Sequence, residues 1–234
     1  MTDTTTAAAP LVADDLLLLL FDPASGTFRG EGSALFHALA GAVLTELALD
    51  GHVQIDDRTT FRGRLVSAVA DPPVDPLLRT TWDRLMTRST DVYSLILEIG
   101  PSLRSVFVER LEDRGHVRRE KRRFLGLIPT TALVDGGTSR RQELLAAVRS
   151  VLVDGTEPDQ RTAAVAALLS ASGALPAMHR EIPWSGAVYT RGVALQNGDW
   201  GAAAAGDAVA RTAAAAILSN SLFATLVLPN VRGN

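Results

Sequence analysis

The stretch LALDGHV (residues 47–53) is typical of a helix that ends at a glycine and leads into a strand, and LEDRGHV (residues 111–117) repeats it. Glycine commonly ends a helix because it adopts positive φ without a steric penalty from a Cβ atom. The residues after each glycine then begin a run typical of a β-hairpin. The sequence therefore predicts two units, each made of a helix, a glycine and a hairpin.

Helical patterns surround these two units and set the expected fold class. Apolar residues recur every three or four positions before each glycine and again through the second half of the chain. We expect a mainly α fold: a single compact helical domain with a central helix bundle and one or two projecting β-hairpins. Residues 1–10 are expected to form a disordered leader, and residues 11–234 a single domain. One expected helix begins at Asp14 and Asp15, and the others cover residues 33–49, 75–87, 93–99, 101–114, 140–152, 159–171, 189–196 and 207–218.

Composition favours a soluble helical protein. The chain has 47% hydrophobic residues but only 5% aromatic ones, which favours close-packed helices over an aromatic-rich sandwich. It lacks cysteine, which excludes disulfides and thiolate metal sites. The longest apolar run near the N-terminus, residues 16–21, is far shorter than a membrane span. We expect a cytoplasmic protein. The arginine bias, with Lys121 the only lysine, suggests a GC-rich bacterial genome, in particular an actinobacterial one.

The residues that usually support catalysis do not form recognisable motifs. No two histidines have the H-x-x-x-H spacing of a metal site, and GGTSRR (residues 136–141) lacks the lysine of a phosphate-binding loop. The acidic pair Asp14-Asp15 is adjacent on an expected helix, where neighbouring side chains do not face each other, so we interpret it as a helix start. We expect no enzyme activity, no cofactor and no metal site. The four histidines are His37, His52, His116 and His179.

One chemical feature is distinctive, a basic cluster around the second repeat. The net charge is −3, yet residues 104–123 contain eight bases and four acids. A solvated run of charge would explain this, but an anion site is the sharper interpretation, because the guanidinium fork fits phosphate oxygens. The apolar stretch FLGLIP (residues 124–129) beside the bases suits a membrane surface or a protein partner.

Three stretches together resemble the Golgi phosphoprotein 3 family, which includes bacterial relatives. They are LTELALDGHVQI (residues 44–55), LEDRGHVRREKRRFLGLIPTT (111–131) and DQRTAAVAALLSASGAL (159–175). The resemblance implies a helical body with a projecting hairpin and no enzyme activity. Eukaryotic members bind phosphatidylinositol 4-phosphate on Golgi membranes and act as adaptors that grip cytoplasmic tails of glycosyltransferases and coat components. The resemblance also implies that the hairpin takes part in self-association.

The family's lipid pocket is only partly matched. It uses a tryptophan and an arginine where this chain has Glu31 and Ala40, and two basic residues where this chain has Pro101 and Arg104. We therefore assign the headgroup contact to Arg104, with Arg110, Arg114 and Arg118 as the residues with which the pocket could be rebuilt. Two alternatives stay open: the site serves another anionic lipid, or it binds none.

Three functions are considered. The first is a non-enzymatic peripheral membrane adaptor that binds an anionic phospholipid headgroup, phosphatidylinositol 4-phosphate by the resemblance, and attaches reversibly to the cytoplasmic face of a membrane. That membrane is the Golgi only in a eukaryote. The second is a soluble protein-interaction or self-assembly module that has lost lipid binding. A protein cargo and a second copy of the chain, contacted through the hairpin, are the protein partners considered. The third, nucleic-acid binding through a basic wing, is disfavoured by a pI near 5.8. The hairpin-tip residues expected to self-associate are Phe124, Leu125, Leu127 and Ile128.

Overall fold

The computed structural model describes residues 9–60, 63–69, 71–124 and 128–198, together with Ala213 and Ala215. Within these residues the fold is mainly helical, as predicted. Its helices are α1 (Val12–Leu20), α2 (Ser33–Leu49), α3 (Pro76–Thr87), α4 (Val92–Asp113), α5 (Arg140–Arg149), α6 (Gln160–Ala171) and α7 (Gly186–Gln196), with a π turn η1 (Ser150–Asp154) and a 3₁₀ turn η2 (Leu175–Met178). Its strands are β1 (Phe21–Asp22), β2 (Thr27–Phe28), β3 (Val53–Thr60), β4 (Gly63–Ala68), β5 (Thr90–Asp91), β6 (Val117–Phe124) and β7 (Ile128–Asp135).

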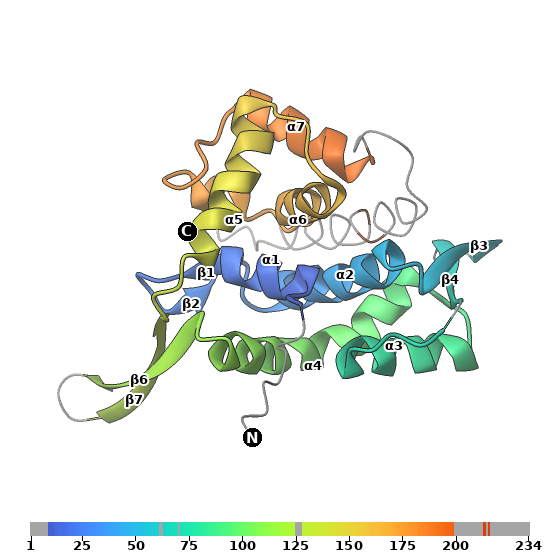
Figure 1. Cartoon of the computed structure of the whole chain (residues 1–234), viewed down its shortest axis with the longest axis horizontal. Helices are drawn as coiled ribbons and strands as arrows, with labels where there is room; N and C mark the ends of the chain where they lie inside the picture. Colours follow the sequence, from blue (N-terminus) through green and yellow to red (C-terminus); the bar gives the residue numbers. More distant parts are fainter. Residues whose placement is uncertain are drawn as a thin grey trace, which may run out of the picture.

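The helices form three layers, of which α1 and α2 are the middle one. Figure 1 shows these two helices between a layer made by α3 and α4 and a second layer made by α5, α6 and α7. Helix α1 packs against α2, α4, α5 and α6, so it has neighbours on every side. This explains why its sequence contains five consecutive leucines in place of a one-sided apolar stripe, since a helix that is apolar all round is a buried one. All its residues are buried.

The repeated stretch forms the same helix end twice. Gly51 follows α2 with φ of 75°, and Gly115 follows α4 with φ of 69°. In each case the N–H of the next histidine donates to the carbonyl of a leucine five residues earlier, at 2.8 Å. This bond is the long hydrogen bond of a Schellman motif, which satisfies a carbonyl that the helix itself leaves unpaired.

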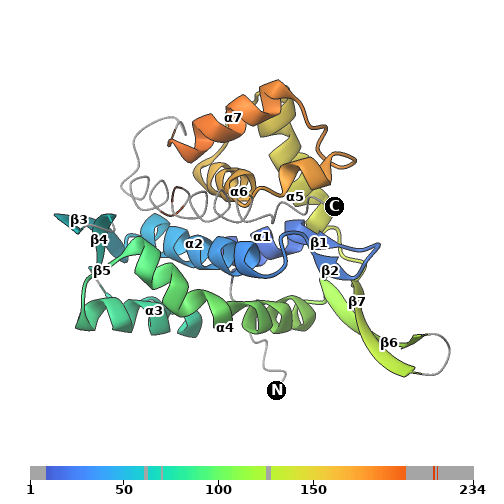
Figure 2. The same cartoon turned by 180° about the vertical axis from the view of Figure 1, so that it is seen from behind.

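Both predicted hairpins are present. Strands β3 and β4 pair antiparallel, and the short β5 pairs with the other edge of β4. Strands β6 and β7 form a separate two-stranded sheet. The β6–β7 register runs without interruption from Val117 opposite Asp135 to Phe124 opposite Ile128. This hairpin projects from the helical layers in both views (Figures 1 and 2). Its strongest contact with the body, beyond its own two strands, is with α4.

Two predicted helix boundaries are wrong. The sequence predicts a new helix at Pro101, but α4 runs through Pro101 as one helix of 22 residues. Proline removes one hydrogen-bond donor and crowds the carbonyl four residues earlier, but the buried face that includes Leu95, Leu103 and Phe107 keeps both halves of the helix on the core. The helix predicted to reach Leu152 ends at Arg149, after which the π turn η1 leads to Gly155.

Candidate functional site

Arg104, the first residue assigned to a headgroup contact, lies on the surface of α4. Its Nη2 atom donates to a carboxylate oxygen of Glu31, and the two side chains are 44% and 42% exposed. Its guanidinium also lies 5.3 Å from the centre of the Phe28 ring. Glu31 and Arg104 occupy two of the positions at which the family resemblance implies a lipid pocket, and the fold pairs this basic residue with this acid. Ala40, a third such position, is buried in α2.

Arg110 lies two turns further along α4 and points inward. Its Nε and Nη2 atoms donate to the two carboxylate oxygens of Asp14 at 3.0 and 3.1 Å, and its Nη1 donates to Asp75 at 3.0 Å. Burial alone would lower the pKa of Arg110, but the hydrogen bonds and negative charges of Asp14 and Asp75 outweigh it and hold this pKa above its ordinary value. The charge of Arg110 is therefore paired with two carboxylates of the helical part of the protein.

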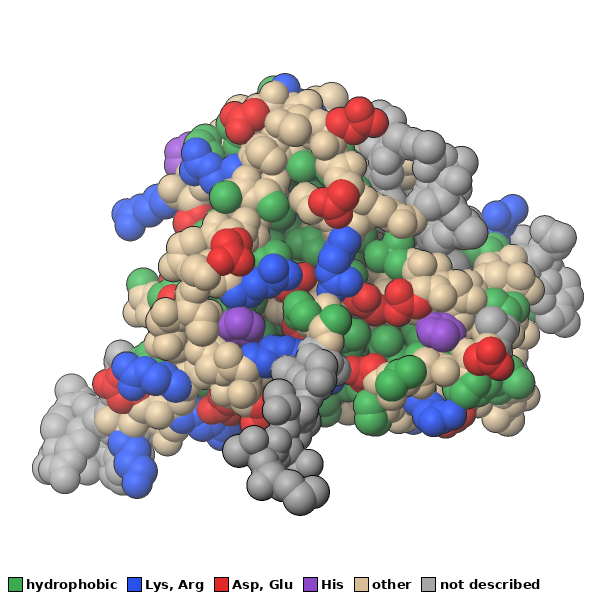
Figure 3. All heavy atoms as spheres, in the orientation of Figure 1, with side chains coloured by type: hydrophobic (Ala, Val, Ile, Leu, Met, Phe, Trp, Pro, Cys, Tyr) green, Lys and Arg blue, Asp and Glu red, His purple; other side chains and the backbone are tan. Residues whose placement is uncertain are grey.

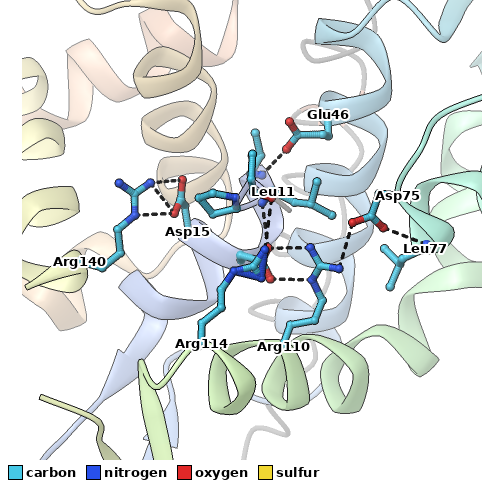
Figure 4. A network of polar contacts seen from close by, with 12 residues as sticks. Leu11, Asp15, Glu46, Asp75, Leu77, Arg110, Arg114 and Arg140 are labelled. Carbon is cyan, nitrogen blue, oxygen red and sulfur yellow. Dashed lines mark hydrogen bonds and ion pairs between the residues drawn. The ribbon is translucent and has the colours of Figure 1, made fainter. Parts of the chain in front are cut away.

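Arg114 joins Arg110 at the same carboxylate. Its Nη1 lies 3.6 Å from Asp14, whose side chain is only 1% exposed, and its Nη2 donates to the carbonyl of Ala9 at 3.3 Å. Figure 4 shows both guanidinium groups directed at the first turn of α1. The structure thus brings Arg110 and Arg114 together, and it brings them together around an internal acid.

Asp15 makes the matching contacts on the other side of α1. Its carboxylate accepts hydrogen bonds from Arg140 at 2.8 Å and lies 3.5 Å from Arg161. Arg161 also donates to Glu46 at 2.9 Å. Burial raises the pKa of Glu46 above its ordinary value, against the lowering effect of the Val12 N–H and of Arg161.

These contacts form one ion network at the start of α1. Its members are the carboxylates of Asp14, Asp15, Glu46 and Asp75 and the guanidinium groups of Arg110, Arg114, Arg140 and Arg161. Four negative charges balance four positive ones, so the network holds α1 to α2, α4, α5 and α6 and presents little net charge. Figure 3 shows acidic and basic side chains side by side in the middle of the face that is seen in the orientation of Figure 1. Sequence reasoning missed Arg140 and Arg161, which no local pattern connects to Asp15.

Arg118 lies apart from the network, on the projecting strand β6. It pairs with Glu120 at 3.4 Å, and the two side chains are 62% and 42% exposed. Its neighbour Arg119 pairs with Glu112 at 2.9 Å while remaining 56% exposed, and Lys121 is exposed. Exposed pairs of this kind contribute about 0–1 kcal/mol and leave much of the positive charge available. The four predicted arginines thus occupy three places: the Glu31 contact, the internal network and the hairpin.

The expected hairpin tip is only partly covered by the structure. Phe124 and Ile128 are opposite each other at the end of the β6–β7 register, although their side chains lie outside the described residues. Leu125 and Leu127 lie wholly outside them. Their predicted role in self-association therefore stays a prediction.

The histidines contact local structural partners. Each Nδ1 atom lies within hydrogen-bond distance of a nearby backbone or hydroxyl atom. The partners are the Ser33 carbonyl for His37, the Asp71 carbonyl for His52, the Thr138 hydroxyl for His116 and the Trp184 N–H for His179. Among the described residues, no three His, Asp or Glu side chains are placed to hold a metal ion. In the same part of the chain, every helix is too short or too polar to span a bilayer.

Comparison with known proteins identifies the family. No curated protein matches this sequence. A family model described as Golgi phosphoprotein 3 (GPP34) matches residues 12–212, a range that starts at α1 and continues past α7. It includes the two helix–glycine–hairpin units and the ion network. Because the match covers well over half of the 234 residues, this chain belongs to the Golgi phosphoprotein 3 family.

Proposed function

We propose that this chain is a non-enzymatic peripheral membrane adaptor that binds an anionic phospholipid headgroup. Phosphatidylinositol 4-phosphate is the proposed lipid on the grounds of family resemblance. Membership of an adaptor family supports the general role. The proposed location is the cytoplasmic face of a membrane, with reversible attachment.

The exposed charge of the β6–β7 hairpin carries this proposal. Between Val117 and Phe124 the strand has five basic residues and a single acid, Glu120. Arg118, Arg119 and Lys121 are exposed, and the hairpin extends away from the helical layers (Figure 1). A projecting basic strand can reach a negatively charged leaflet without rearrangement of the core. Each arginine or lysine near such a surface contributes about 1 kcal/mol to binding.

In this proposal the arginines of α4 and its end have two roles: one contacts the lipid headgroup, and the others hold α1 in position. Arg104 stays in the proposed headgroup contact, because its pair with Glu31 is exposed to solvent and therefore weak. Arg110 and Arg114 contact Asp14, which is almost completely buried, and freeing them would leave that carboxylate uncompensated. We therefore propose that they position α1 and that Arg118 and its neighbours on the hairpin meet the lipid.

Neutralising the hairpin cations tests the proposal. The variant Arg118→Gln, Arg119→Gln, Lys121→Gln is expected to lower affinity for vesicles containing phosphatidylinositol 4-phosphate about 100-fold, since three charges are lost at about 1 kcal/mol each. Co-sedimentation with these vesicles, at low and high ionic strength, measures the change. The matched control replaces three exposed arginines with glutamine: Arg79 and Arg84 of α3, and Arg88 directly after it. Equal binding by the two variants would contradict a role for the hairpin.

Two single variants in the same assay examine the other proposed contact. Arg104→Ala is expected to weaken binding, whereas Glu31→Gln is expected to strengthen it, because it removes the carboxylate that neutralises Arg104. Unchanged binding of Arg104→Ala would remove this residue from the site and leave the hairpin as the whole of it.

One observation favours a second candidate function, protein interaction or self-assembly through the hairpin. Among the described residues, β6 and β7 pair only with each other, so the outer edge of each strand has no partner strand. Unpaired edges are templates for strand addition by another chain. The apolar tip residues predicted from the sequence would add buried surface to such a contact.

The second candidate predicts a concentration-dependent assembly that the tip stabilises. The variant Phe124→Ser, Leu127→Ser is expected to raise the dissociation constant of the assembly at least about 100-fold, because burying each side chain contributes about 1.5–3 kcal/mol. Sedimentation velocity over a range of protein concentrations measures this shift. Val74→Ser with Met86→Ser, two exposed apolar residues elsewhere, provides the control. An assembly that survives the tip variant would exclude the tip as the contact.

A further inference from the structure

Three arginine side chains converge on one glutamate that takes no part in the α1 network. Arg141 and Arg149 lie about two turns apart on α5, and Arg29 follows β2. Glu181 lies in the loop between η2 and α7. Its Oε1 accepts from Arg141 at 2.5 Å, its Oε2 lies 3.0 Å from Arg29, and its backbone carbonyl accepts from Arg149 at 2.6 Å. We call these four residues the Glu181 cluster.

The Glu181 carboxylate does not accept a hydrogen bond from every donor around it. Arg141 is only 7% exposed, and its Nε atom is buried without an acceptor among the described residues. In that same part of the chain, the buried Oε2 atom of Glu181 accepts no hydrogen bond, although Arg29 is close to it. An unsatisfied buried donor or acceptor costs about 1–3 kcal/mol. The Glu181 carboxylate, as it is held here, therefore leaves a buried donor of this guanidinium set without an acceptor.

The cluster also carries an excess of positive charge. Three guanidinium groups face Glu181 and one further carboxylate, Asp22, which lies 3.8 Å from Arg29. Partial burial would raise the pKa of Asp22. The Ala24 N–H, the Ser25 hydroxyl and the charges of Arg29 and Arg141 hold that pKa below its ordinary value. Arg29 and Arg141 thus act on a second carboxylate as well as on Glu181.

We propose that Arg29, Arg141 and Arg149 form a binding site for a phosphoryl group, and that Glu181 is the chain's own competitor for it. A phosphoryl group offers three oxygens and up to two negative charges, which suit convergent guanidinium forks better than one carboxylate does. The site can be reached from solvent, since the Glu181 side chain is 22% exposed and Arg149 is exposed. This site goes beyond the proposed membrane function and uses none of its residues.

Removing the competing charge tests the site directly. Titration calorimetry with inorganic phosphate is expected to show at least about tenfold tighter binding to Glu181→Gln than to the wild-type chain. This factor is the lower end of what a hydrogen bond to a charged group contributes. Adding Arg141→Gln to the Glu181→Gln variant is expected to abolish the gain. Adding Arg79→Gln, which removes an exposed arginine of α3, is expected to preserve it.

A parallel arm distinguishes a soluble ligand from a lipid. Vesicles containing phosphatidic acid replace inorganic phosphate, and co-sedimentation replaces calorimetry. A gain with both probes assigns the site to phosphorylated groups in general, and a gain with vesicles alone assigns it to a lipid headgroup. The absence of any gain in a folded Glu181→Gln chain would overturn the proposal and leave the cluster as an internal clasp between α5 and the loop.

A second variant keeps the test decisive if Glu181→Gln does not fold. Glu181→Asp retains the charge but shortens the side chain by one methylene, which draws the carboxylate away from Arg141 and Arg29. It is expected to bind inorganic phosphate more tightly than the wild-type chain, and equal binding would overturn the proposal. The calorimetric arms contain no membrane, so failure of the hairpin proposal would leave their result unaffected.

Discussion

Replacing Asp14 with alanine is expected to lower the free energy of unfolding by about 3–5 kcal/mol, because it leaves a partly buried cluster of like charges without its shared counter-ion. Arg110 and Arg114 are only 19% and 17% exposed and both contact this carboxylate. The Leu11 N–H, which donates to Asp14 at 2.8 Å, loses its acceptor as well. The damage thus combines the loss of a counter-ion shared by two guanidinium groups, of which Arg110 keeps Asp75 as a partner, with one orphaned backbone donor.

Urea denaturation followed by circular dichroism at neutral pH measures this loss. The control is Asp83→Ala, which removes an equal charge from an exposed position on α3 and is expected to change stability by less than about 0.5 kcal/mol. A double-mutant cycle with Arg110→Met should give a coupling energy of at least about 0.5 kcal/mol, as expected for residues in one network. A loss below that of an exposed ion pair, about 1 kcal/mol, would mean that the network does not hold α1 in place.

The Asp14 network shows where prediction from sequence succeeds and where it ends. Asp14 and Asp15 were predicted to start a helix, and they do lie in the first turn of α1. Their partners, however, lie 96 to 146 residues away along the chain. Local spacing indicates which residues share a helix face, but it does not indicate which distant arginine faces a given acid. The sequence therefore shows the bases of the predicted anion site without the acids that neutralise them.

The same limit explains the other outcomes. Both helix ends at Gly51 and Gly115 were predictable, because a Schellman motif depends on a few consecutive residues. The continuity of α4 through Pro101 was not, because packing of its buried face overrides a local signal. The pairing of Glu31 with Arg104 joins residues 73 positions apart, and only the packing of α4 beside the loop between β2 and α2 reveals it. Features set by a few consecutive residues were thus predictable from the sequence, and contacts between residues far apart in it were not.

Replacing Gly136 with alanine is expected to destabilise the base of the β6–β7 hairpin by about 3 kcal/mol, the upper end of the usual cost of overpacking. A Cβ atom at this position would lie 1.8 Å from the backbone carbonyl oxygen of Gly115. The Gly136 N–H also donates to the His116 carbonyl at 2.9 Å, so the two chain segments are held together where the clash occurs. Because both partners are backbone, no side-chain rotation relieves the overlap, and the hairpin must tilt away from α4.

The adjacent Gly137 provides a matched control, because a Cβ atom there would meet nothing within 4 Å while its φ of 85° favours glycine. Gly137→Ala should therefore cost only about 1–2 kcal/mol of backbone strain. Urea denaturation ranks the two variants, and vesicle co-sedimentation adds a second readout. If the hairpin presents its cations from a fixed base, Gly136→Ala should weaken membrane binding even where the chain is fully folded, and Gly137→Ala should weaken it less. Equal stability and equal binding of the two variants would show that contact between Gly115 and Gly136 does not set the direction of the hairpin.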